Sequence, residues 1–124
     1  MHSATFKYFQ TQLNAGVSCE VLILQVLANI DIQDSRLGLF EYIGREQALS
    51  AARTLDEAPN LRDELPLYGM PFAVKDIIDV AEMPIKFGCK APIGYTAQSD
   101  AAVVRKLKRL GAIVVGKTVT TELN

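Results

Sequence analysis

The sequence predicts an α/β fold in which N-terminal helices are followed by a βαβ-type unit. Apolar residues recur at helical spacing in the first part of the chain, and two short apolar runs, at residues 69–74 and 113–115, flank a later amphipathic segment. A strand, a helix and a strand in this order favour parallel pairing with a right-handed crossover. We expect the 124 residues to form part of one domain: 1–56 helical, 57–68 a connector, and 69–124 strand, loop, helix and strand.

Two helices are expected in the N-terminal part, at residues 18–30 and 45–56. Ser18 can cap the first helix, because its hydroxyl accepts a hydrogen bond from an amide of the first turn that has no other partner. Apolar residues lie on more than one face of this helix, which predicts burial from several sides. The second helix has a single apolar stripe, formed by Ala48, Ala51, Ala52 and Leu55.

The C-terminal part predicts two strands joined by a loop and a helix. Pro71 is expected near the start of the first strand, and Ile77 and Ile78 extend that strand or begin a partner. Ser99 is expected to cap the helix, and Gly111 to end it with a positive φ. The helix is expected to bury Val103, Leu107 and Leu110, and the second strand to span residues 112–116.

Composition excludes several classes of function. Thirteen Lys and Arg residues against fourteen Asp and Glu give a net charge of -1, so we expect neither a nucleic acid nor a membrane as a partner. The basic run at 105–109 lies on the expected helix and is typical of a solvated face. Cys19, Cys89 and His2 are too few for a structural zinc site, and a Ser-His-Asp triad would have to use the N-terminal His2. We expect no metal and no cofactor.

The expected compartment is the cytoplasm. Two cysteines do not make a disulfide scaffold. The most apolar stretch, residues 21–30, is interrupted by polar side chains and is shorter than the ~20 residues that span a bilayer. No basic segment directly precedes it and no small-residue cleavage site follows, which argues against a signal peptide.

Residues 111–118, GAIVVGKT, match the pattern of a phosphate-binding loop letter for letter. In such a loop the first glycine follows a strand and a helix begins at the lysine, whereas Gly111 follows an expected helix. The residues between the two glycines are mostly β-branched and favour a strand. We interpret the segment as a helix end followed by a strand, and nucleotide binding there is only a third hypothesis.

Lys75 is the candidate catalytic residue. It ends the apolar run 69–74, and burial at such a strand end disfavours the charged ammonium, which lets a lysine serve as a base. Taken alone, the residues leave an alternative open, which is an ion-paired strand end with Asp76 or Asp79 as the partner.

The segments around Lys75 and after it resemble a known family. Residues 69–84, GMPFAVKDIIDVAEMP, are similar to the opening segment of amidase signature enzymes, as are residues 100–107, DAAVVRKL, followed by 111–123, GAIVVGKTVTTEL. These segments occur in the family's order and spacing. The helices at 18–30 and 45–56 are similar to its N-terminal helices, so the resemblance covers nearly the whole chain.

The resemblance implies a larger sheet of amidase-type α/β/α architecture, of which this chain is the start. It implies cleavage of carboxamide C–N bonds in a small-molecule amide by a Ser-cis-Ser-Lys triad, with Lys75 as the base that acts through the bridging serine. Some members of the family pass ammonia onward within amidotransferases. A Gly/Ser-rich loop supplies both serines, and backbone amides form the oxyanion hole. The base is needed because a serine hydroxyl is otherwise a poor nucleophile.

The sequence also departs from the family pattern. Where many members have a small, polar Gly-Ser stretch after the Met-Pro pair, this chain has KFGCK at residues 86–90, which affects contacts on the substrate side. The Gly/Ser-rich segment of the family does not occur before Asn124. None of the serines present stands next to a glycine: Ser3, Ser18, Ser35, Ser50 and Ser99. We expect one catalytic residue of three in this chain, and no amidase activity from the chain alone.

Two functions remain as alternatives. The first is the N-terminal part of an amidase-signature hydrolase. The second is a non-catalytic product, either truncated or a subunit completed by a partner chain. Strands that belong to a larger sheet leave apolar surface uncovered. We therefore expect a poor independent folder that can associate through exposed apolar patches around Ile77, Ile78 and Val114.

Overall fold

The structure, a computed structural model, describes residues 5–120, so His2 and Ser3 lie outside the described residues. Its helices are α1 (Phe6–Asn14), α2 (Cys19–Leu37), α3 (Arg45–Asp56) and α4 (Ala102–Arg109), with a short 3-10 helix, η1 (Pro59–Arg62). Its strands are β1 (Phe40–Ile43), β2 (Pro71–Lys75), β3 (Pro84–Ile85), β4 (Tyr95–Thr96) and β5 (Ile113–Thr118).

The main sheet has the strand order β1-β5-β2. β2 and β5 are parallel, as the sequence predicts, with Pro71 opposite Ile113 and Lys75 opposite Thr118. β1 pairs antiparallel with the C-terminal half of β5, and β3 and β4 form a separate pair. β2 is therefore an edge strand, with no neighbour on its far side among residues 5–120.

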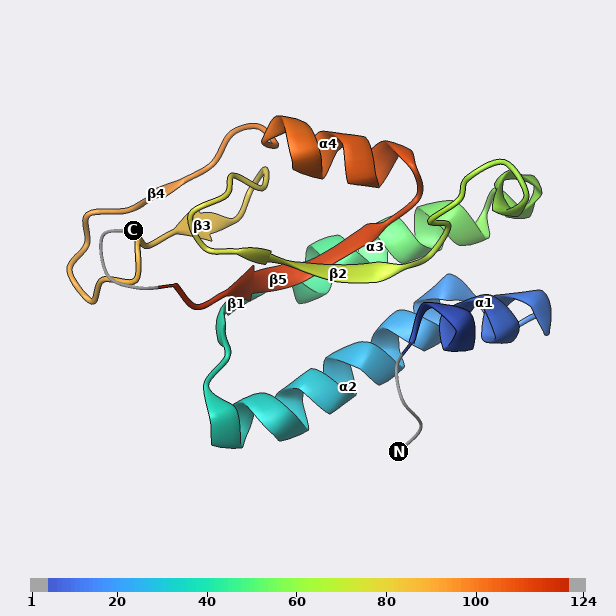
Figure 1. Ribbon diagram of the computed structural model, residues 1–124, viewed down its shortest axis with the longest axis horizontal. Helices are drawn as coiled ribbons and strands as arrows, with labels where there is room; N and C mark the ends of the chain where they lie inside the picture. Colours follow the sequence, from blue (N-terminus) through green and yellow to red (C-terminus); the bar gives the residue numbers. More distant parts are fainter. Residues whose placement is uncertain (1–4, 121–124) are drawn as a thin grey trace.

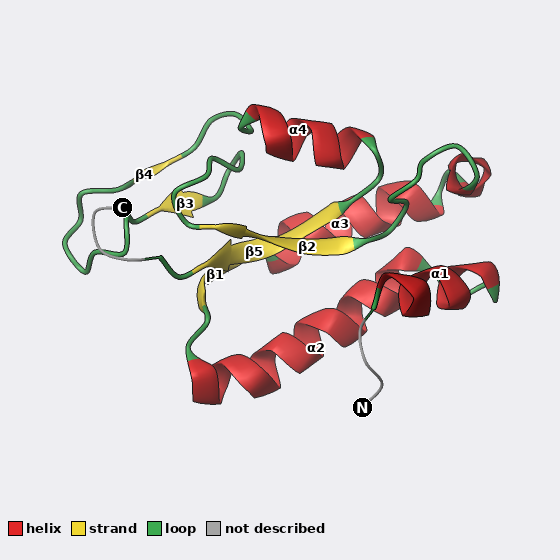
Figure 2. Ribbon diagram, viewed as in Figure 1, coloured by secondary structure: helices red, strands yellow, loops and turns green. Residues whose placement is uncertain are grey.

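Helices lie on both sides of this sheet and make the α/β/α arrangement (Figures 1 and 2). One core is built from α1, α2 and α3, and Ile113 and Val115 of β5 belong to it. A second core, on the side of α4, joins Val114 to Val104 of α4 and Val74 of β2. Because β5 is covered on both faces, its residues form a continuous apolar run instead of alternating with polar ones.

α2 begins where the sequence predicts. The Ser18 hydroxyl accepts a hydrogen bond from the Val21 amide at 3.1 Å. The helix continues past the expected end at residue 30 and stops at Leu37, before Gly38 in the left-handed conformation. Burial from several sides is wrong within residues 5–120: the buried side chains lie toward one core, and Val21 and Leu24 are 44% and 47% exposed.

A strand interrupts the part that was expected to be entirely helical. β1 follows α2, and the Asp34 carboxylate accepts hydrogen bonds from the amides of Leu39 and Phe40 as the chain leaves the helix. The β1 sequence, FEYI, is rich in aromatic and β-branched residues, which favour strands. Four residues are too few to show the alternation of apolar and polar side chains that marks a strand, so the sequence pattern does not predict β1.

α4 starts later than the sequence predicts. Its first residue is Ala102, and no side chain caps it, so the role expected for Ser99 is wrong. Asp100 binds elsewhere, because its carboxylate accepts a hydrogen bond from the Ala81 amide and pairs with Lys108. That carboxylate joins the start of α4 to the turn after β2.

The buried face of α4 also differs from the expected one. Val104 is 1% exposed and packs in the second core, whereas Val103 is 55% exposed. Leu107 and Leu110 are half-buried. The expected face is therefore wrong at Val103 alone, whose place in the core is taken by Val104.

Residues 111–118 form a helix end and a strand, as predicted, and their geometry is not that of a phosphate-binding loop. Lys117 lies within β5 instead of opening a helix. Gly111 has a φ of +101°, and a Cβ at this position would lie 2.8 Å from the Cα of Tyr68. Both the backbone angle and the close approach therefore require glycine here.

The expected apolar patch is wrong at Val114. This residue is 4% exposed, because Val104 of α4 packs in the same core. Ile77 and Ile78 are half-buried. Half of the large exposed apolar side chains within residues 5–120 lie instead on α2 and just after it: Val21, Leu24, Ile32, Leu37 and Leu39.

No helix within residues 5–120 combines the length and the apolar character that crossing a membrane would require.

Candidate active site

Lys75 is the last residue of β2, at the open edge of the sheet. It stands opposite Thr118, so the two parallel strands end together. Its side chain is exposed, which corrects the expectation of burial. The apolar run before Lys75 is covered by the two cores, but the strand end has no neighbouring strand on its far side within the described part of the chain.

Neither neighbouring aspartate binds Lys75. The Asp76 carboxylate accepts hydrogen bonds from two backbone amides of the following loop. The Asp79 carboxylate accepts a hydrogen bond from the Tyr95 hydroxyl at 2.8 Å. The ion pairs within residues 5–120 do not include Lys75, so the ion-paired strand end is wrong here. The amine is available for a further residue or a substrate.

Asp76, which follows the candidate base, is held at three points. Its N–H donates to the Thr118 carbonyl at 2.9 Å. Its own carbonyl accepts a hydrogen bond from the Lys117 ammonium at 2.8 Å. Its carboxylate is fully buried and accepts from the amides of Lys86 at 3.0 Å and Gly88 at 3.3 Å. These bonds join the end of β2 to both β5 and the loop after β3.

Lys117 is a fully buried lysine whose ammonium binds backbone carbonyls. Besides the carbonyl of Asp76, it reaches that of Pro84 at 3.3 Å. Burial lowers the pKa of Lys117, and the negative charges of Asp76 and Asp79 act in the opposite direction. These two aspartates partly compensate for the cost of burying an ammonium.

Lys117 and Lys75 lie on opposite faces of the sheet. Lys117 stands opposite Val74 on the neighbouring strand, and paired residues project to the same face. Successive residues of a strand alternate between faces, so Lys75 projects away from Lys117. Lys117 therefore contacts the backbone next to Lys75 from the opposite face of the sheet. A substrate bound at the Lys75 amine would not touch the Lys117 side chain.

A hollow of about 700 Å³ is formed mainly by residues 84–96, which include the loop whose amides bind the Asp76 carboxylate. It is lined by Lys86, Gly88, Cys89 and Tyr95, among others. Phe87 and Gly88 both have positive φ, at 56° and 69°, so the loop turns tightly where its amides meet Asp76. This is the stretch in which the sequence departs from the amidase pattern.

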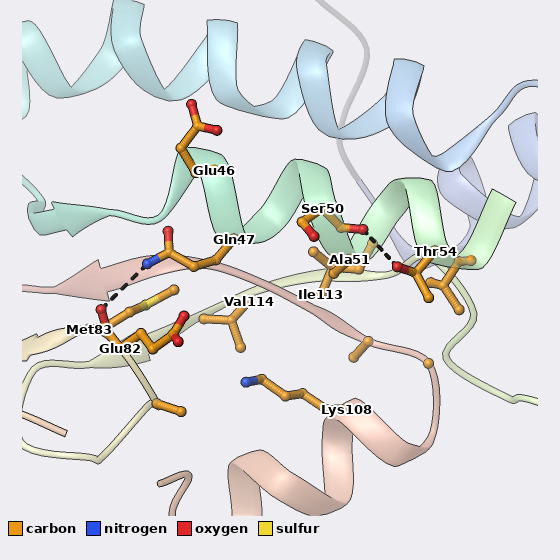
Figure 3. Close-up of a pocket in the computed structure, with 14 residues that line it drawn as sticks. Glu46, Gln47, Ser50, Ala51, Thr54, Glu82, Met83, Lys108, Ile113 and Val114 are labelled. Atoms are coloured by element: carbon orange, nitrogen blue, oxygen red, sulfur yellow. Dashed lines mark hydrogen bonds between the residues drawn. The ribbon is translucent and has the colours of Figure 1, made fainter. Parts of the chain in front are cut away.

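Another hollow, of about 730 Å³, lies between α3 and α4 (Figure 3). Gln47 and Glu46 of α3 and Lys108 of α4 line it, along with the first residues of β5. Gln47 donates to the Glu82 carbonyl, and Lys108 pairs with Asp100. This hollow adjoins the N-terminal half of β5, whereas Lys75 aligns with its C-terminal end. Size alone therefore does not identify the reactive site.

The described serines have structural positions. No serine hydroxyl among residues 5–120 bonds to Lys75: Ser18 caps α2, Ser35 donates to the Ile32 carbonyl, Ser50 lies on α3 and Ser99 is exposed before α4. Within the same residues, no three His, Cys, Asp or Glu side chains are grouped so that they could hold a metal ion. The distinctive chemical group of this region is the amine of Lys75.

The resemblance to amidase signature enzymes implies an α/β/α frame with Lys75 at a strand end, and the exposure of Lys75 at an edge strand goes beyond that expectation. Comparison with known proteins supports the family. The family model Amidase matches residues 21–124. The chain therefore belongs to the amidase family.

Individual relatives point the same way. The chain is 42% identical over 110 residues to "Putative amidase AmiA2" of Mycobacterium bovis. This match covers 87% of this chain and 22% of that protein. It is 35% identical over 119 residues to a glutamyl-tRNA(Gln) amidotransferase subunit of Salinibacter ruber, covering 95% and 23%. The native peptide amidase of Stenotrophomonas maltophilia superimposes with a TM-score of 0.75 at 32% identity, over 89% of this chain and 23% of that one. The chain thus spans about a quarter of the length of these relatives.

Sequence patterns single out Lys75 as the candidate base. They indicate Asp76 only as an ion-pair partner of Lys75, and Lys117 only as part of a match to a phosphate-binding loop, so the structural roles of both residues were missed. The signal that could have found them was two ionisable residues at the ends of apolar runs, because such residues must find partners when they are buried.

Proposed function

We propose that this chain is the N-terminal part of an amide hydrolase and supplies the base of its active site. In this proposal Lys75 belongs to a Ser-cis-Ser-Lys triad that cleaves the C–N bond of a carboxamide. The two serines and the oxyanion hole come from residues outside those described. The observation that carries the proposal is the position of Lys75, exposed at the end of an edge strand in a chain of the amidase family.

The chemistry needs a base beside a serine. The amine accepts the proton of the bridging serine, which in turn takes the proton of the nucleophilic serine as that oxygen attacks the amide carbon. A lysine can accept a proton only in its neutral form, and loss of solvent favours that form. The open side of β2 leaves space for a covering segment, which would both bring the serines and remove water from the amine.

The substrate proposed is a small-molecule carboxamide. The hollow formed by residues 84–96 adjoins the loop bound to Asp76, and it is the natural place for groups that distinguish one amide from another. Its lysines and Cys89 differ from the small polar pattern of the family. We propose the cytoplasm as the compartment, because two cysteines in a chain of this length do not make the disulfide scaffold of a small secreted domain.

A second candidate is a subunit that acts with a partner chain. It is favoured by the match to a protein that is named as one of the subunits of an amidotransferase. In this case the same lysine would serve in an amidase reaction that delivers ammonia to the partner. The two candidates share the chemistry at Lys75 and differ in where the ammonia goes.

Ammonia release from simple carboxamides tests the proposal. Residues 1–124 alone should release none, and a complete amidase that carries this segment should release it at a rate that requires Lys75. Dependence of the rate on an added partner chain would select the second candidate. Hydrolysis by residues 1–124 alone, unchanged by Lys75→Ala, would overturn both.

A further inference from the structure

The buried ammonium of Lys117 has no part in the chemistry described above. A buried charge contributes little to stability as a rule, because its desolvation offsets what its partners return. At this position a methionine would fill a similar volume without that cost. The bonds that Lys117 makes therefore indicate what an ammonium does here that an apolar side chain could not.

Those bonds converge on the backbone just after Lys75. The ammonium donates to the Asp76 carbonyl at 2.8 Å and to the Pro84 carbonyl at 3.3 Å. It thereby connects the peptide unit that follows Lys75 to the first residue of β3. The loop that follows β3 is held by the buried Asp76 carboxylate, through the amides of Lys86 and Gly88.

We propose that Lys117 is a positioning residue for Lys75, which it holds through the Asp76 backbone from the opposite face of the sheet. This inference rests on the proposed function, since it concerns the base of that reaction. Lys117 touches no substrate. Its effect is to keep the end of β2 and the segment 84–88, which comprises β3 and the loop after it, in one fixed arrangement. The Lys75 amine then has a defined place beside the bridging serine.

A base that is displaced by a small distance loses much of its effect. A misplacement of about 1 Å can cost roughly a hundred-fold in rate. The Asp76 carbonyl loses its ammonium donor when Lys117 is replaced by methionine, whereas the Asp76 N–H keeps its bond to Thr118 and the carboxylate keeps its bonds to the loop after β3. We therefore expect the chemical step to slow, while substrate binding changes little.

The test uses a complete amidase that carries this segment. Lys117→Met should lower kcat by roughly ten- to a hundred-fold per folded molecule, with KM changed by less than about threefold. Lys117→Gln keeps N–H donors that can reach a carbonyl, and it should recover part of the lost kcat. Lys106→Met is the matched control, because Lys106 is an exposed lysine on α4, and its kcat should equal that of the unaltered enzyme.

Amide hydrogen exchange gives a readout that does not depend on activity. Exchange of the peptide covering residues 76–88 should become faster in Lys117→Met, and exchange in α2 and α3 should not. If kcat per folded molecule is unchanged in Lys117→Met, the positioning role is wrong. It is also wrong if Lys117→Met and Lys117→Gln lose activity only in proportion to the fraction unfolded. Lys75→Ala, measured in parallel, separates the two proposals: activity in that variant would overturn the proposed function itself.

Discussion

Two buried ionisable residues, Asp76 and Lys117, show how single side chains shape the region around Lys75. Both are fully buried, and both bind backbone groups instead of each other's charged atoms. Backbone amides satisfy the carboxylate and backbone carbonyls satisfy the ammonium, so neither charge is left without a hydrogen-bond partner in the interior. The end of β2 is consequently joined to both β5 and the loop after β3.

Cys19 is a third buried ionisable residue with a defined electrostatic setting. It opens α2, and its amide and that of Glu20 both donate to the Asp56 carboxylate, at 2.7 and 3.0 Å. A helix N-terminus usually favours a thiolate. Here burial first, and then the charge of Asp56, raise the pKa of Cys19 to about 12.

The thiol of Cys19 is therefore expected to be inert. At pH 8 its thiolate fraction is negligible, so iodoacetamide should alkylate the half-buried Cys89 and leave Cys19 intact. Peptide mass spectrometry after a timed reaction measures both sites. Denaturation in guanidinium is the control and should expose both cysteines equally. Equal labelling of the two in the native protein would contradict this assignment.

Alkaline pH should weaken the same region. Burial also raises the pKa of Tyr68, to about 12, with Cys19 as the next cause. Both groups stay neutral in the folded state over a pH range in which the unfolded chain has already lost these protons. The unfolded state then binds fewer protons, so the free energy of unfolding falls as pH rises from about 9 toward 12.

Urea unfolding between pH 8 and pH 11 measures this loss. The lowered pKa of Lys117 acts with the opposite sign, because its unfolded form binds more protons in that range. Cys19→Ala removes one of the two contributions, so its stability should decline less steeply with pH. A decline as steep as that of the unaltered chain would contradict the role of Cys19.

At the scale of elements, the sequence predicts those that have both a period and a boundary residue. α2 starts at its serine cap, α3 matches the expected 45–56, and β5 follows Gly111. The elements that were missed are short or depend on partners far along the chain. β1, β3 and β4 have four residues or fewer, and the start of α4 is displaced because the Asp100 carboxylate binds Ala81 and Lys108.

The candidate site divides in the same way. Lys75 could be placed at a strand end from the apolar run before it. Its exposure could not be predicted, because that depends on which side of the sheet β2 occupies. The contact between Lys117 and Asp76 joins residues 41 positions apart, and no local pattern in the sequence reports such a pair.

Gly111 tests the junction between α4 and β5. Gly111→Ala combines a positive φ with a Cβ placed 2.8 Å from the Tyr68 Cα, and it should lower the free energy of unfolding by about 2 kcal/mol or more. Gly38→Ala is the matched control, since Gly38 also has a positive φ but nothing lies within 4 Å of its Cβ position. It should cost only about 1 kcal/mol.

Urea unfolding of the two variants compares them directly. If Gly111→Ala were no more destabilising than Gly38→Ala, the close packing of this junction on Tyr68 would be wrong.

At the scale of the whole molecule, the described chain has two cores, an open edge at β2 and exposed apolar side chains on α2. Unpaired edges and uncovered apolar surface promote association. Residues 1–124 alone should therefore self-associate as concentration rises, in analytical ultracentrifugation. The double variant Val21→Lys, Leu24→Lys places charge on the exposed face of α2 and should reduce association. A monomer at all concentrations would contradict this expectation.

The central claim is that Lys75 is the base of an amide hydrolase. The most direct measurement is kcat for carboxamide hydrolysis by a complete amidase carrying this segment, with and without Lys75→Ala. We predict a loss of about a thousand-fold or more with little change in the thermal midpoint, because the Lys75 side chain is not part of either core within residues 5–120. Lys106→Ala, an exposed lysine on α4, should leave kcat unchanged. A folded Lys75→Ala variant that keeps most of its activity would contradict the claim.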